Sequence, residues 1–181
     1  MDVVILISRG CLSLVFALSV QGKARDRRDF AEFTASVGAL VPAVADRARQ
    51  VAALVVAAEA ATVVALAVPG TVLPGLALAA ALLGAFTLLA VAASRSPTGT
   101  PCRCFGRSSV PFGAVHAVRN AGLLAVAAAG IAATALAEPG SITPVAAVSA
   151  WLAGGVLGLL ATTLDDLVGL FRPLPRKDQS P

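Results

Sequence analysis

The chain has 181 residues, of which 57% are hydrophobic and 13% are charged. So few polar side chains cannot cover the core of a soluble domain of this length, which excludes a water-soluble enzyme or binding module. The formal net charge of +4 comes mainly from basic residues that lie between apolar runs. This pattern is typical of the loops that anchor a membrane protein, so the lipid bilayer is the expected partner and nucleic acid is not.

Five apolar runs are each about long enough to cross a bilayer. In chain order they cover residues 3–20, 51–68, 72–93, 113–137 and 145–164. They consist mainly of Ala, Leu, Val and Gly, whose small side chains let membrane helices approach closely. The sequence therefore predicts an all-α polytopic transmembrane bundle of four to five spans within residues 1–171, followed by a disordered cytoplasmic tail at 172–181.

A charged segment, QGKARDRRDFAEF at residues 21–33, joins the first two runs. Phe30 and Phe33 are three residues apart in this segment, and side chains with that spacing share one face of a helix. We expect an amphipathic turn or helix at the membrane interface here.

Lys and Arg outside the apolar runs fall in three segments, at residues 21–50, 94–112 and 172–181. With five spans, these segments share one side of the membrane. The positive-inside rule then predicts an external N-terminus and a cytoplasmic C-terminus in the plasma membrane. The same rule predicts a cytoplasmic position for the segment at 94–112.

The connector between the third and fourth runs, SPTGTPCRCFGRSSVPFG at residues 96–113, contains Cys102 and Cys104. Arg103 and Arg107 favour the thiolate, which is the reactive form of cysteine. A disulfide closed over a single residue is tight, and strain makes a disulfide easier to reduce. The pair therefore suits thiol–disulfide exchange better than a structural crosslink, and two incidental loop cysteines are the alternative.

The other cysteine, Cys11, lies inside the first apolar run. We interpret it as a small buried apolar side chain, with a third exchanging thiol as the alternative. A zinc site is disfavoured, because a closed site needs four ligands and His116 is the chain's single histidine.

Charged residues also occur within the apolar runs: Arg9 in the first, Glu59 in the second and Arg119 in the fourth. Such groups are expensive in lipid, so they usually face the bundle interior and find partners. Glu59 and Arg119 lie at depths that differ by about one helical turn, and we predict an ion pair between them. The pair either fixes helix packing or lines a polar path that relays protons or holds the head group of a quinone, the cofactor that this reading suggests.

His116 and Asn120 are four residues apart in the fourth run, and residues with this spacing share one face of a helix. Histidine is the side chain whose ordinary pKa lies near neutrality. His116 could accept a proton from a thiol in the preceding connector, or it could simply cap the interface.

The motif CRCFG at residues 102–106, followed by Arg119 and Asn120 in the next run, resembles the MauE family of membrane proteins, which is related to DoxX-like proteins. Glu59 in the second run, Lys23 after the first run and Phe30 fit the same layout. The resemblance extends from about residue 8 to about residue 137. Where the family usually has a small residue between the cysteines, this chain has Arg103.

The resemblance implies a protein that helps to form or transfer disulfides, together with a thioredoxin-like partner, as in the maturation of methylamine dehydrogenase. On this reading the chain is a membrane thiol–disulfide oxidoreductase with Cys102 and Cys104 as the exchanging pair. Arg103 would favour the thiolate. The adjacent polar pocket would be lined by Glu59, His116, Arg119 and Asn120. The alternatives are a small membrane transporter, with Glu59 and Arg119 lining its path, and a structural membrane module.

Overall fold

The fold is a helical bundle, seen here in a computed structural model that describes residues 2–95, 114–136 and 142–170, with side chains in the last range described as far as residue 163. These residues form helices and no strand. The helices are α1 (Asp2–Ala24), α2 (Arg27–Leu40), η1 (Pro42–Arg47), α3 (Ala48–Ala67), η2 (Pro69–Thr71), α4 (Val72–Arg95), α5 (Ala114–Ala135) and α6 (Pro144–Leu170). Within this described part, five helices are long and apolar enough to cross a membrane, so the predicted all-α polytopic bundle is confirmed.

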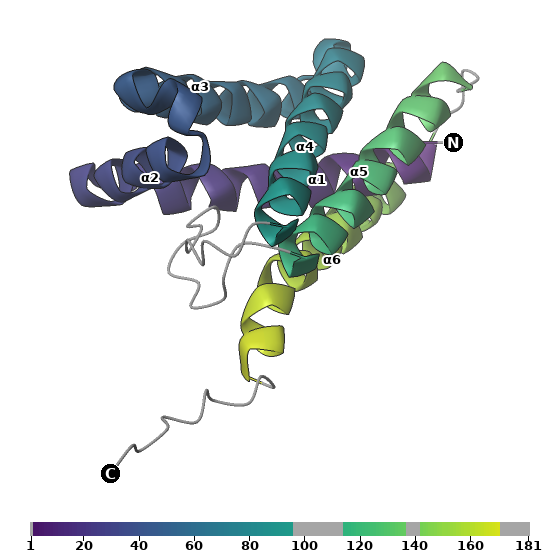
Figure 1. The fold of residues 1–181 in the computed structure, drawn as a ribbon. Coiled ribbons are helices and arrows are strands. Elements are labelled where there is room, and N and C mark those ends of the chain that lie inside the picture. Colours follow the sequence, from purple (N-terminus) through teal and green to yellow (C-terminus); the bar gives the residue numbers. More distant parts are fainter. Residues whose placement is uncertain (1, 96–113, 137–141, 171–181) are drawn as a thin grey trace.

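Helix α1 is the centre of the bundle and contacts each of the other five α-helices (Figure 1). Its buried face includes Leu12, Val15 and Phe16, which are at most 2% exposed. These side chains pack against α3, α4 and α5 through Leu66, Leu76 and Leu123. The core is therefore built around α1, and the outer faces of α3 to α6 remain apolar and exposed, as lipid contact requires.

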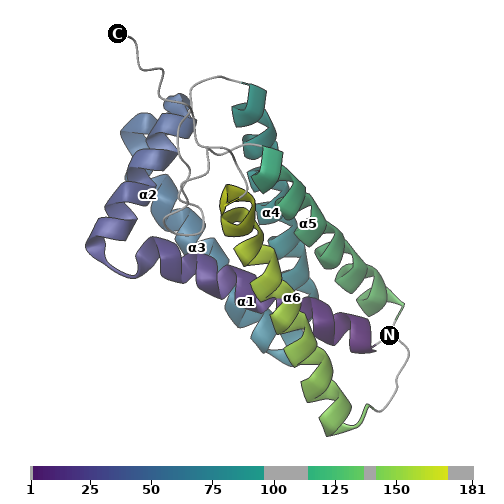
Figure 2. The same cartoon turned by 90° about the horizontal axis from the view of Figure 1, so that it is seen from below.

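Helix α6 crosses α1 at very close range, and helices α4 and α5 lie side by side (Figure 2). A Cβ atom on Gly154 would stand 2.1 Å from the carbonyl oxygen of Ile7, and one on Gly10 would stand 2.0 Å from that of Trp151. Only glycine permits this approach of two backbones, which is how small residues join membrane helices. Gly154 and Gly158 are four residues apart and form the α6 side of this contact.

Residues 27–33 of the charged segment form the first half of helix α2, so a helix is present there, and its position at the membrane interface stays a prediction. Asp26 caps α2, since its carboxylate accepts hydrogen bonds of 2.8 Å from the backbone N–H groups of Arg28 and Asp29. Capping by Asp satisfies donors that the first helical turn leaves unpaired. Phe33 is buried while Phe30 is partly exposed, so the apolar edge of α2 faces the bundle.

Candidate functional site

A buried ion pair joins the end of α1 to the middle of α3. Lys23 Nζ contacts Glu59 Oε1, and Ser19 Oγ donates a hydrogen bond of 3.0 Å to the same oxygen. Lys23 Nζ also donates to Ser19 Oγ at 2.8 Å. Lys23 is 1% exposed and Glu59 is 0% exposed, so neither charge reaches solvent. We call Ser19, Lys23 and Glu59 the ion-pair cluster.

Helix geometry accounts for this arrangement. Ser19 and Lys23 are four residues apart on α1, so both side chains lie on the face that packs against α3. Glu59 projects from α3 into that interface. Its second carboxylate oxygen, Oε2, has no hydrogen-bond partner among the described residues.

Two aromatic rings cover the ammonium group of Lys23. The ring centroids of Phe33 on α2 and Phe86 on α4 lie 5.0 and 5.2 Å from Nζ. Both distances fall within the range of cation–π attraction. Helix α2 therefore covers the ion-pair cluster, which explains how Lys23 is buried so close to the end of a membrane-spanning helix.

Helix α5 brings further polar groups to the same region. His116, Arg119 and Asn120 are 2%, 6% and 2% exposed. Arg119 donates through Nε and Nη2 to Asn120 Oδ1, at 3.4 and 3.3 Å. Arg119 also lies near enough to Lys23 for their positive charges to repel each other. The polar residues predicted on this helix thus all face the interior.

The prediction for Glu59 and Arg119 is wrong about the partner in the ion pair. Among the described residues, the carboxylate of Glu59 is paired with Lys23 and not with Arg119. The reason is that α1 continues as a helix to Ala24, past the end of its apolar run, and carries Lys23 into the bundle. The prediction that Glu59 and Arg119 lie in the same part of the membrane agrees with the proximity of Arg119 to Lys23.

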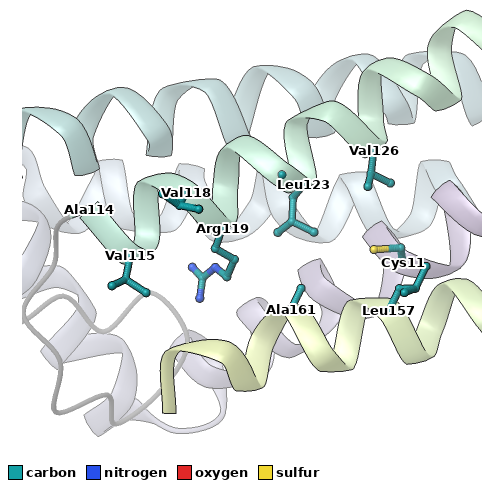
Figure 3. Close-up of a pocket in the computed structure, with 10 residues that line it drawn as sticks. Cys11, Ala114, Val115, Val118, Arg119, Leu123, Val126, Leu157 and Ala161 are labelled. Atoms are coloured by element: carbon teal, nitrogen blue, oxygen red, sulfur yellow. The ribbon is translucent and has the colours of Figure 1, made fainter. Parts of the chain in front are cut away.

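A cavity of about 590 Å³ lies between α5, α6 and α1 (Figure 3). Arg119 projects toward it from α5, and the thiol of Cys11 lies at the other end, close to Val126 and Leu157. Apart from Arg119 and Cys11, the described residues that line it are apolar or glycine: Ala114, Val115, Val118, Gly122, Leu123, Val126, Leu157 and Ala161. Arg119 is therefore the one charged group among the described residues of this largely apolar lining.

Cys11 and Arg9 are placed by α1. Cys11 is 2% exposed and packs with the core cluster, which confirms its reading as a buried side chain. Arg9 donates through Nε to the carbonyl of Leu66 at 2.9 Å and through Nη2 to that of Ala67 at 3.1 Å. The last carbonyls of a helix have no partner within it, so Arg9 satisfies the end of α3.

The cysteine pair and its intervening arginine, Cys102, Arg103 and Cys104, lie outside the described residues, as does the predicted tail at 172–181. Before the pair, the described chain ends with α4 at Arg95. After the pair, it resumes with α5 at Ala114. Arg119 lies about 8 Å along α5 from that start, at 1.5 Å per residue.

Comparison with known families shows which family the chain belongs to. The family model described as methylamine utilisation protein MauE matches residues 1–134. The chain belongs to the MauE family. No curated protein and no solved structure matches the chain.

The MauE match spans α1 to α5 and ends within α5, before α6 begins at Pro144. It therefore includes the ion-pair cluster, the polar residues of α5 and the cysteine motif. Of the cavity, only the wall formed by Leu157 and Ala161 lies beyond the match. The shared part of this MauE protein thus contains every residue that the sequence singled out as a candidate.

Sequence reasoning missed Ser19 and the role of Lys23 as the partner of Glu59. Hydropathy assigns Lys23 to the connecting segment because it follows the apolar run. Two signals could have found it. The four-residue spacing of Ser19 and Lys23 continues the periodicity of the first helix, and Lys23 and Glu59 are both among the residues that fit the MauE resemblance.

Proposed function

We propose that this MauE protein is a membrane thiol–disulfide oxidoreductase in which Cys102 and Cys104 exchange a disulfide with a partner protein. In one direction a thiolate of the pair attacks the partner's disulfide and forms a mixed disulfide. The second thiolate then displaces the partner's sulfur, so the pair becomes oxidised and the partner becomes a dithiol. Atoms and electrons balance between the two proteins, and the reverse sequence delivers a disulfide.

The observation that carries the proposal is the buried polar region within the MauE match. Arg119 lies within the first two turns of the helix that follows the cysteine connector, and Lys23 is nearby. Positive charge near a thiol favours its thiolate. Glu59 forms a buried ion pair with Lys23 in the same region, so this part of the bundle already holds charged groups.

The partner follows from the chemistry and from the family. A thioredoxin-like protein presents an exposed dithiol or disulfide and is the natural donor or acceptor for such a pair. The family description, methylamine utilisation, makes disulfide-containing proteins of that metabolism the first substrates to test.

The test is thiol exchange in proteoliposomes with a thioredoxin-like protein as the partner. We expect Cys102→Ser and Cys104→Ser each to lower the exchange rate by about 100-fold or more, because either change removes a sulfur that forms a bond. Cys11→Ala is the matched control, since Cys11 packs as a small apolar group, and it should retain the rate within about threefold. Full activity of the Cys102→Ser, Cys104→Ser double variant would refute the proposal.

The same assay separates the alternative of a transporter. A polar transport path would make the protein sensitive at Glu59 and tolerant of both cysteine changes. The described residues instead enclose Lys23 and Glu59 beneath Phe33 and Phe86, with 1% or less of either charged side chain exposed. Groups that line a transport path are exposed to it. The burial of Lys23 and Glu59 therefore favours a role in which their charges act on a nearby reaction.

A further inference from the structure

We infer that the cavity between α1, α5 and α6 binds the ring of a membrane quinone, which accepts the electrons of the cysteine pair. The inference rests on the proposed function for its redox step, and on the cavity alone for its binding step. Within the described residues, α5 and α6 touch at few points, whereas α1 packs closely with both. The cavity occupies the space that this divergence leaves.

The cavity is open toward lipid. Val118 and Leu157 on its rim are 73% and 51% exposed, and both lie within membrane-spanning helices. Gly122 adds to the opening, because no atom lies within 4 Å of where its Cβ would be. A ligand that dissolves in the bilayer could therefore enter sideways between α5 and α6 without crossing water.

The size of the cavity fits a ring and the start of a chain. Its volume of about 590 Å³ falls within the usual range of small-molecule sites. Along α5, the seven steps from Arg119 to Val126 span about 10 Å at 1.5 Å per residue. The ring would lie beside Arg119, and its isoprenoid chain would leave through the lipid-facing side.

Arg119, the one charged group among the described lining residues, selects the ligand's polar chemistry. A guanidinium group donates hydrogen bonds in a fixed plane, which suits a ring carbonyl oxygen. An anionic phospholipid would also be attracted, but burying its charged phosphate in a wall that is otherwise apolar carries a large desolvation penalty. Arg119 is only 6% exposed, so a neutral ring that needs one or two hydrogen bonds fits better.

The redox step balances with this ligand. Oxidation of the Cys102–Cys104 dithiol forms one S–S bond and releases two electrons and two protons. Reduction of a quinone to its quinol consumes two electrons and two protons. The quinone therefore supplies the oxidant that disulfide formation needs.

Photo-crosslinking with an azido derivative of decylubiquinone tests the binding step. The protein is reconstituted in nanodiscs as the Cys102→Ser, Cys104→Ser variant, so the result does not depend on thiol exchange. We expect crosslinks in α5 and α6 around the cavity that unlabelled decylubiquinone competes away and that an anionic phospholipid does not. Crosslinks elsewhere, or equal competition by phosphatidylglycerol, would overturn the quinone site.

Two glycines provide matched variants. Gly122→Leu places a side chain in this cavity, whereas Gly155→Leu places one in a second cavity of about 500 Å³ between α1, α3 and α6. Neither glycine has an atom within 4 Å of its would-be Cβ, so both variants should fold. We expect Gly122→Leu to reduce specific crosslinking by about tenfold and Gly155→Leu to change it by less than about twofold. Equal effects of the two would contradict the assignment.

The redox step has its own readout. With reduced wild-type protein in anaerobic nanodiscs, added decylubiquinone should yield one quinol per protein and one Cys102–Cys104 disulfide. Specific crosslinking without quinol formation would retain the binding site and overturn the electron transfer. Thiol exchange without specific crosslinking would retain the proposed function and overturn the quinone site.

Discussion

Lys23 and Glu59 are each stable in the bundle because the other is present. A charged side chain within a membrane protein must find a partner, and breaking a buried pair leaves an uncompensated charge. Ser19 adds hydrogen bonds to both partners, and two aromatic rings cover the ammonium group. The pair is therefore coupled, and the two residues should not respond independently to substitution.

We predict that Lys23→Met lowers the free energy of unfolding by about 3–5 kcal/mol, because the carboxylate of Glu59 stays buried without its partner. The double variant Lys23→Met, Glu59→Leu should lose less than the sum of the two single changes, since it removes both charges. Denaturant titration in mixed micelles measures all three values. Additive losses would show that the two side chains do not interact.

Arg9 gives a second test at this scale. Its two hydrogen bonds satisfy the carbonyls of Leu66 and Ala67, which the end of α3 leaves without helical partners. Arg9→Met should lower the free energy of unfolding by about 1–3 kcal/mol, with Arg28→Met near zero as the exposed control. The same titration measures both free energies of unfolding. An unchanged value for Arg9→Met would show that the hydrogen bonds from the guanidinium to these carbonyls do not stabilise the protein.

At the scale of helices, the contact of α1 with α6 depends on backbones that almost touch. Gly154 and Gly158 allow this, because a Cβ at either position would collide with carbonyl oxygens of α1 at 2.1 and 2.6 Å. Gly155, next in the chain, points into open space. Neighbouring glycines on α6 therefore differ sharply in whether they tolerate a larger side chain.

We expect Gly154→Ala to destabilise the protein by about 1–3 kcal/mol, because α1 and α6 must separate to admit the methyl group. Gly155→Ala should be neutral or slightly stabilising, since alanine favours the helix and meets nothing. Thermal unfolding in detergent compares the two. Similar midpoints for both variants would contradict the close crossing.

The helices were more predictable than their contacts. Hydropathy located all five spans, because lipid requires long apolar runs whatever the runs pack against. It placed the end of α1 too early, since Lys23 is stabilised by Glu59 and Phe33 from elsewhere in the chain. The partner of Glu59 was wrong for the same reason: periodicity gives the face and depth of a residue, but not which of several neighbouring helices it meets.

For the whole molecule, the distribution of basic residues still predicts its sidedness. Arg95 lies at the end of α4, and further basic residues lie between α1 and α3. With five spans, both positions are expected on the same side of the membrane. Positive charge resists translocation, so this side should be cytoplasmic. The prediction places Cys102 and Cys104 inside the cell, where a cytoplasmic thiol donor could reach them.

Labelling of cysteines checks this sidedness. A membrane-impermeant maleimide should leave Cys102 and Cys104 unmodified in intact cells and modify them after permeabilisation and reduction. A cysteine introduced at Thr143, just before α6, is the matched control and should be labelled from outside. The reverse pattern would invert the orientation and give the pair access to extracytoplasmic substrates.

The central position of α1 has a consequence for biogenesis. It is synthesised before the helices that it contacts, because the partner of Lys23 is 36 residues later and one carbonyl partner of Arg9 is 57 residues later. At about 5–20 residues per second, synthesis delays these partners by several seconds. During that interval α1 lacks the groups of α3 that Lys23 and Arg9 contact, so the contact between α1 and α3 can form only after α3 has been synthesised.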